Sequence, residues 1–135
     1  MTLKKTVKQM VQEAEASIKT FPVLEAMKLL DSDDHVFIDL RDVRELDHDG
    51  MIPDAFHAPR GMIEFWVDPE SPYHKDIFAS GKTFVFYCRS GWRSALVTKA
   101  VQDMGLEPVC HIHGGFSAWM EAGCFVADRP KKKKD

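Results

Sequence analysis

Cysteine is scarce in this sequence, and its three cysteines form no Cys-x-x-Cys pair. An odd number of cysteines without a repeating spacing argues against a disulfide framework and favours a reducing compartment. Long apolar runs are also missing, since no stretch approaches the roughly 20 apolar residues that a membrane span requires. Lys4, Lys5 and Lys8 interrupt the apolar segment that a secretory leader would need. We therefore expect a cytoplasmic protein that does not enter a membrane.

A large excess of charge of either sign is lacking as well. The formal net charge is −3 at pH 7 over 135 residues, so the chain as a whole has no electrostatic attraction for nucleic acid or for a membrane surface. The charges are unevenly distributed: residues 25–54 hold ten acidic against three basic residues, and lysines occupy positions 131–134. We interpret the lysine run as a solvated end, with docking to an acidic partner as the alternative.

The length of the chain fits a single domain. The apolar pattern at the start of the chain predicts an additional helix that precedes this domain. Apolar residues lie at helical spacing on one stripe near the start of the chain: Val7, Met10, Val11, Ala14 and Ile18. We expect a helix over residues 6–17 that packs on the domain or on a second copy of the chain. The predicted divisions are an N-terminal helical extension (1–17), a domain (18–127) and a basic tail (128–135).

Strand-like and helix-like segments alternate along the rest of the chain. Residues 36–40 form a near-continuous apolar run, which is typical of a parallel strand buried on both faces. Further strands are expected within residues 18–21, 52–58, 83–87 and 106–112. Helices are expected within residues 22–30, 41–50, 63–67, 94–104 and 116–122. This alternation predicts an α/β domain with a mostly parallel sheet.

The most informative segment is the heptapeptide CRSGWRS, which runs from Cys88 to Ser94 between a predicted strand and a predicted helix. Successive backbone N–H groups in such a loop can form an anion-binding nest, and the helix N-terminus adds partial positive charge. These surroundings stabilise a cysteine thiolate, and Gly91 permits a turn in which a side chain would clash. Arg89 and Arg93 provide cationic forks for an oxyanion. The pattern predicts a nucleophilic cysteine beside an anion site.

Four segments of the sequence, in this order, resemble motifs of the rhodanese family of sulfurtransferases: Ile38–Asp42, Gly50–Ala55, Cys88–Ser94 and Gly114–Trp119. They resemble the family's Ile-Asp-Val-Arg-Glu element, its Gly-His-Ile-Pro-Gly-Ala element, its active-site loop and its Gly-Gly-x-x-x-Trp turn. The resemblance covers residues 18–127. It implies a three-layer α/β fold, in which a small, mostly parallel sheet is flanked by helices, with the N-terminal helix as an addition.

The resemblance also implies an activity. Cys88 would carry a transient persulfide, taking sulfane sulfur from thiosulfate or a related donor and passing it to cyanide or a thiol. Such transfer requires neither a metal nor an organic cofactor. The residues expected to bind the substrate or the persulfide are those of the loop and one further arginine: Arg89, Ser90, Gly91, Trp92, Arg93 and Arg60. A supporting role is expected for Asp39 and Arg41, as an ion pair at the end of a buried strand, and a direct catalytic role is the alternative.

The remaining cysteines and two residues near the predicted site have alternative interpretations. We interpret Cys110 and Cys124 as small buried apolar residues, and the alternative is a resolving thiol for the Cys88 persulfide. Trp92 is expected at the rim, in contact with a donor or a partner protein. His113 precedes the glycine turn, and a position near Cys88 is an alternative to an ordinary structural role.

Two other function classes stay open. A persulfide carrier without turnover, or a purely protein-binding module, would dock a protein thiol partner through the N-terminal helix, the lysine tail or Trp92. The second open class is phosphate or arsenate chemistry, because cysteine phosphatases use a similar loop. Four residues separate Cys88 from Arg93, whereas those phosphatases have five and hence a wider cradle. The tighter loop favours sulfur transfer.

Overall fold

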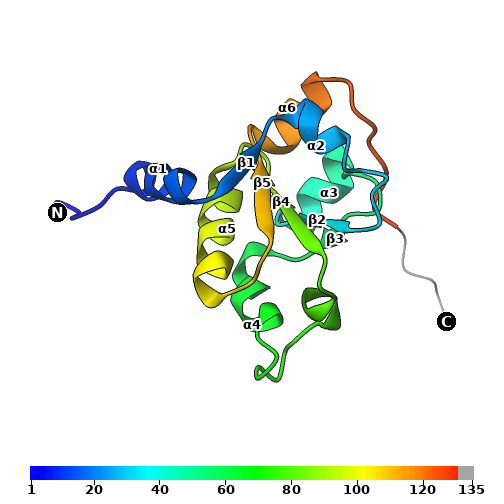
Figure 1. Cartoon of the computed structure of the whole chain (residues 1–135). Helices are drawn as coiled ribbons and strands as arrows, with labels where there is room; N and C mark the ends of the chain where they lie inside the picture. The colour runs from blue at the N-terminus through cyan, green and yellow to red at the C-terminus, as the bar shows by residue number, and fades with distance from the viewer. Residues whose placement is uncertain (131–135) are drawn as a thin grey trace.

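The computed structural model describes residues 1–130 and contains one five-stranded sheet (Figure 1). The strands lie in the order β1-β5-β4-β2-β3, and each neighbouring pair is parallel. Their bounds are β1 Lys19–Phe21, β2 His35–Asp39, β3 Phe56–His57, β4 Thr83–Tyr87 and β5 Val109–Ile112. The predicted parallel α/β sheet is confirmed, and β4 lies at its centre.

The helices that precede and connect these strands agree in number and order with the predicted ones. They are α1 Val7–Ser17, α2 Val23–Met27, α3 Val43–Asp49, α4 Ile63–Val67, α5 Trp92–Met104 and α6 Gly115–Glu121. Two 3-10 turns, Arg60–Met62 and Asp76–Ala79, flank α4 in the segment that connects β3 to β4. Long crossovers of this kind are what parallel strands require.

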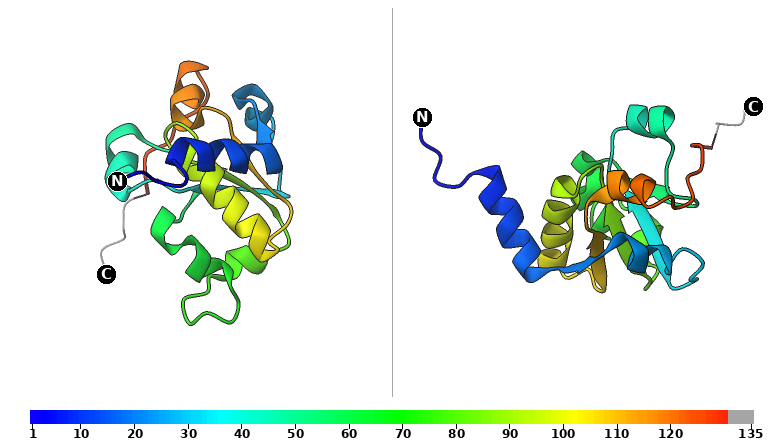
Figure 2. Two further views of the ribbon diagram at one scale, coloured as in Figure 1. Left: turned by 90° about the vertical axis from the view of Figure 1, so that its left-hand side faces the viewer. Right: turned by 90° about the horizontal axis from the view of Figure 1, so that it is seen from above.

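Helices cover both faces of the sheet, which gives three layers (Figure 2). Successive side chains of a strand point to opposite faces, and β4 shows the division clearly. Phe84 and Phe86 belong to the core cluster that α4 and α5 cover. Val85 and Tyr87 belong to the cluster on the other face, with Phe116 of α6. The three-layer fold implied by the resemblance is therefore confirmed.

The N-terminal helix is also present, and its start follows from the sequence. Thr6 and Gln9 form a capping box, in which each side chain accepts a hydrogen bond from the other residue's backbone N–H. Val11 and Ala14 are buried against Ala95 of α5. The helix therefore packs on the domain through one stripe, while the rest of it projects from the body (Figure 2).

Several elements differ from their predicted bounds, and three of these differences have a clear local cause or consequence. The helix after Pro22 ends at Met27, because two reverse-turn hydrogen bonds, from Leu29 and Leu30, replace its last turn. The strand expected from residue 106 begins only at Val109, after the proline that lacks a donor. The helix expected from Ser94 begins two residues earlier, at Trp92. This last difference matters, because it makes the cysteine loop shorter and tighter.

The segment after α6 returns to the region of α3. Met51 and Ala127 exchange two backbone hydrogen bonds of 2.8 Å, and the guanidinium of Arg129 pairs with Asp47 at 2.6 Å. The lysine run at 131–134 lies outside the described residues, so its role stays a prediction. Within residues 1–130, the helices lack the combined length and apolar character that crossing a membrane requires.

Candidate active site

Cys88 lies at the carboxyl end of the central strand. It follows Tyr87, the last residue of β4, and only 1 % of its surface is exposed. In open parallel sheets, ligands bind outside the carboxyl ends of the strands, where the connecting loops meet. The predicted nucleophile therefore occupies the position at which this class of fold builds its sites.

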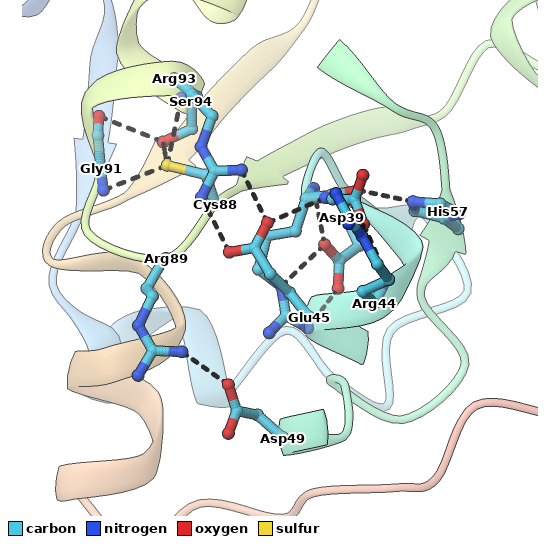
Figure 3. A network of polar contacts seen from close by, with 12 residues as sticks. Asp39, Arg44, Glu45, Asp49, His57, Cys88, Arg89, Gly91, Arg93 and Ser94 are labelled. Atoms are coloured by element: carbon cyan, nitrogen blue, oxygen red, sulfur yellow. Dashed lines mark hydrogen bonds and ion pairs between the residues drawn. The ribbon is translucent and has the colours of Figure 1, made fainter. Parts of the chain in front are cut away.

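Backbone N–H groups surround the sulfur of Cys88, as the predicted nest requires. The N–H of Gly91 donates to Sγ at 3.2 Å and the N–H of Ser94 at 3.4 Å. The hydroxyl of Ser94 lies 3.6 Å from the same sulfur. Gly91 has a φ of 108°, which an L-residue rarely adopts. Figure 3 shows the sulfur held on the inner side of this loop. The arrangement can stabilise negative charge on sulfur.

The glycine turn after β5 supports the same loop from behind. Phe116 donates its N–H to the carbonyl of Cys88 at 2.8 Å, and Ser117 donates to the carbonyl of Arg89 at 3.0 Å. Gly115 lies so close that a Cβ on it would come within 2.5 Å of the Cys88 carbonyl oxygen. Two motifs that begin 26 residues apart in sequence, at Cys88 and Gly114, thus form one packed unit.

Both loop arginines are bound to carboxylates of α3. The guanidinium of Arg93 forms a bidentate pair with Glu45, at 2.9 and 3.1 Å. Arg89 pairs with Asp49 at 2.6 Å (Figure 3). The hydrogen bond to Glu45, and to a smaller extent the charge on Cys88, raise the pKa of Arg93. The sequence predicted the two guanidiniums at the loop, but it gave no indication that acidic residues bind them.

Glu45 has a second contact, which fixes its position. It is the third residue of α3, and its carboxylate also accepts the N–H of the N-cap residue Asp42 at 2.9 Å. This is the reciprocal half of a capping box. The start of α3 therefore holds Glu45 in place, and Glu45 holds Arg93 at the loop.

The expected ion pair of Asp39 and Arg41 is completely buried. Arg41 donates to both carboxylate oxygens, at 3.0 and 2.7 Å, and also to the carbonyl of Gly50 at 2.8 Å. The hydroxyl of Tyr87 donates to Asp39 at 2.5 Å and accepts the N–H of Ile52 at 3.1 Å. This network joins β2, the loop that holds the second motif, and Tyr87, the residue of β4 that precedes the cysteine. The geometry fits the structural ion pair that was expected from the burial of this strand end.

A buried chain of polar side chains leads away from Cys88, and sequence reasoning missed it. The hydroxyl of Ser94 contacts Nδ1 of His111 at 2.9 Å, and Nε2 of His111 contacts the hydroxyl of Thr20 at 3.1 Å. Burial lowers the pKa of His111 to about 4, so the imidazole is neutral at pH 7. The signal available in the sequence was a histidine within the otherwise apolar strand 109–112.

The other predicted site residues have varied surroundings. Trp92 and Ser90 are exposed on the loop. The guanidinium of Arg60 pairs with Glu64 at 3.3 Å and lines a groove of about 360 Å³ between α1 and α5. None of its hydrogen bonds runs to the cysteine loop. A substrate contact for Arg60 therefore stays a prediction.

The two remaining cysteines are buried and reduced. Burial raises the pKa of Cys110 to about 12 and also raises the pKa of Cys124. A thiol with a raised pKa is a poor nucleophile at neutral pH. His113 is exposed and donates its backbone N–H to the carbonyl of Phe21. These features favour a structural interpretation of all three residues.

Comparison with known proteins places this geometry among sulfurtransferases. A family model described as a rhodanese-like domain matches residues 23–122. A sulfurtransferase of Allochromatium vinosum is 33 % identical over 98 residues, which are 73 % of this chain and 83 % of that protein. A putative sulfurtransferase of Bacillus subtilis is 32 % identical over 103 residues, which are 76 % of this chain and 90 % of that protein.

Two solved structures resemble the chain over most of its length. One, from Rhodopseudomonas palustris, is described as a protein of unknown function and possible tyrosine phosphatase; it is 51 % identical with a TM-score of 0.91, covering 93 % of this chain and 97 % of its own. The other is a polysulfide-sulfur transferase homodimer from Wolinella succinogenes, 28 % identical with a TM-score of 0.68, covering 90 % and 87 %.

Proposed function

We propose that this chain, which belongs to the rhodanese-like domain family, transfers sulfane sulfur through a persulfide on Cys88. The donor is thiosulfate or a related sulfane compound, and the acceptor is a thiophile such as cyanide or a thiol. The observation that carries the proposal is the pair of N–H groups, from Gly91 and Ser94, directed at the sulfur of Cys88. They stabilise the thiolate charge that this sulfur bears before the persulfide forms and after the outer sulfur has been passed on.

The reaction has two nucleophilic steps. In the first, the Cys88 thiolate attacks the outer sulfur of the donor; the Sγ–S bond forms, the donor's S–S bond breaks, and the rest of the donor leaves with the electron pair. With thiosulfate, this leaving group is sulfite. In the second, the acceptor attacks the outer sulfur of the persulfide, and Cys88 leaves as a thiolate. The chain's own loop supplies the positive electrostatic potential for both steps.

Phosphate ester hydrolysis is the competing function, because the Rhodopseudomonas palustris relative is described as a possible tyrosine phosphatase. Two observations favour sulfur transfer instead. The loop has four residues between Cys88 and Arg93 and is packed tightly against Gly115. The arginine that would bind the phosphate oxygens is already paired, in a bidentate manner, with Glu45.

A persulfide carrier that docks a protein thiol is the second alternative. Trp92 is 48 % exposed beside the nucleophile, and Val7 and Met10 are exposed on α1. Such surfaces suit a protein partner. In that case the persulfide on Cys88 would persist until the partner thiol arrives, and turnover with small acceptors would be slow.

The test is an intact-mass measurement of the reduced protein after brief exposure to thiosulfate, followed by addition of cyanide. We expect a gain of one sulfur atom that cyanide removes as thiocyanate, and no gain in the Cys88→Ser variant. Hydrolysis of p-nitrophenyl phosphate that depends on Cys88, without any sulfur adduct, would instead support the phosphatase. A stable adduct that cyanide removes only slowly would support the carrier.

A further inference from the structure

The two arginines of the cysteine loop are bound to carboxylates that a different element supplies. Glu45 and Asp49 both lie on α3, one turn apart, and face the loop (Figure 3). Their oxygens approach Arg93 at 2.9 Å and Arg89 at 2.6 Å. The carboxylate side chains are 27 % and 19 % exposed. These ion pairs are therefore partly shielded from solvent at the mouth of the site.

We infer that Glu45 and Asp49 are specificity-determining residues, which make the site favour a sulfane donor of low negative charge over the thiosulfate dianion. The inference rests on the proposed function. The substrate class is an organic persulfide, or another sulfane compound with at most one negative charge near the transferred sulfur. The carboxylates act in two ways: they accept hydrogen bonds from the two guanidiniums, and they cancel the positive charge that would attract a dianion.

The charges on α3 support this inference. Two of its carboxylates, Glu45 and Asp49, pair with the loop arginines, whereas Asp47 pairs with Arg129. The hydrogen bond from Arg93 lowers the pKa of Glu45, and hydrogen bonds from His48 and Arg89 lower the pKa of Asp49. Both groups are thus ionised at neutral pH. A dianion arriving at the loop meets arginines that the carboxylates already neutralise, so it gains little Coulomb attraction from them.

The arrangement also explains how Arg93 can serve the cysteine while paired. Its guanidinium has five N–H donors, and Glu45 accepts from two of its nitrogens. The charge of Cys88 contributes to the raised pKa of Arg93 after the larger effect of Glu45. Glu45 therefore fixes the guanidinium beside the thiolate and reduces its capacity to bind a second anion.

With an organic persulfide as donor, the transfer step balances without a further reagent. The Cys88 thiolate attacks the outer sulfur of R–S–SH, the Sγ–S bond forms, and the S–S bond of the donor breaks. R–S⁻ leaves with the electron pair, and the proton stays on the transferred sulfur. One negative charge enters the step and one leaves, so the site needs no additional cation.

The test compares two donors with the same reacting group and different charge: thiosulfate, a dianion, and benzenethiosulfonate, a monoanion. We measure kcat/KM for each with cyanide as acceptor. Glu45→Gln removes the charge and preserves the helix cap, because glutamine also completes a capping box. Since Coulomb energy scales with the donor's charge, we expect kcat/KM to rise about tenfold for thiosulfate and about threefold for benzenethiosulfonate. Asp49→Asn should act in the same direction.

The matched control is Asp47→Asn, which removes the same charge from the same helix. Asp47 pairs with Arg129 rather than with a loop arginine, so we expect kcat/KM for both donors to stay within twofold of the parent. An equal rise in Asp47→Asn and Glu45→Gln would overturn the inference, because it would show a general charge effect. A fall for both donors in Glu45→Gln would also overturn it. Absence of transfer from either donor in the parent protein would refute the proposed function itself.

Discussion

Replacing Gly115 by alanine tests whether the glycine turn shapes the cysteine loop. An added Cβ would lie 2.5 Å from the carbonyl oxygen of Cys88 and 2.7 Å from the carbonyl carbon of Arg89. Gly115 also has a φ of 59°, in the left-handed region that favours glycine. The change therefore combines backbone strain with a collision against the loop that holds the nucleophile.

Backbone strain and steric overlap both lower the free energy of unfolding. The left-handed conformation costs an L-residue about 1–2 kcal/mol, and forcing an extra carbon into packed structure costs about 1–3 kcal/mol. The collision is with backbone atoms, which cannot rotate away, so we expect the free energy of unfolding to fall by about 2–5 kcal/mol in total. For a domain of this size, that corresponds to a drop in Tm of roughly 8–20 °C.

Gly123→Ala is the matched control, because Gly123 has a φ of 73° but nothing within 4 Å of an added Cβ. It isolates the backbone strain, and we expect a drop in Tm of only about 4–8 °C. Thermal unfolding gives both values, and the rate of persulfide formation at low temperature should fall in Gly115→Ala alone. If both variants lose the same stability and keep the same rate, the turn does not constrain the loop.

The remaining predictions concern buried groups. Burial lowers the pKa of His111 to about 4, below its value near 6.5 in the unfolded chain. Between pH 6.5 and pH 4, the unfolded chain therefore binds a proton that the folded chain does not bind. The free energy of unfolding has its full value above pH 6.5, and we expect it to fall by up to about 3 kcal/mol as the pH drops to 4. Urea unfolding of His111→Gln should show a flatter pH profile; an unchanged slope would contradict this. Asp39→Asn leaves Arg41 without its counter-ion and should lose about 3–5 kcal/mol in the same assay. A loss no larger than in the exposed Asp47→Asn would contradict a structural role for the pair.

The sequence predicted the backbone of the site because each motif encodes a local geometry. A strand followed by Cys88, a loop with Gly91 and a helix start gave the position and orientation of the nucleophile. The apolar stripe from Val7 to Ile18 predicted the N-terminal helix. These features depend on neighbours a few residues away, so one sequence contains all the information that is needed.

The partners of the charged and polar side chains could not be predicted, because those partners lie far away in the sequence. Glu45 and Arg93 are 48 residues apart, as are Asp39 and Tyr87. Nothing in the spacing of such residues indicates that crossovers of a parallel sheet bring them together. The acid-rich composition of residues 25–54 was visible, but its placement against the loop arginines is a product of the tertiary fold. The same holds for His111, whose contact with Ser94 crosses from β5 to α5.

The two hydrogen bonds that the glycine turn gives to the carbonyls of Cys88 and Arg89 restrict how this loop can evolve. One end of the loop is fixed by Phe116 and Ser117, and the other by the first turn of α5. An inserted residue can therefore be accommodated only between Ser90 and Trp92. A lineage that lengthened the loop there would widen the cradle without losing the nucleophile. Insertions elsewhere would break the packed unit, so a change between sulfur and phosphate chemistry on this scaffold is confined to the junctions on either side of Gly91.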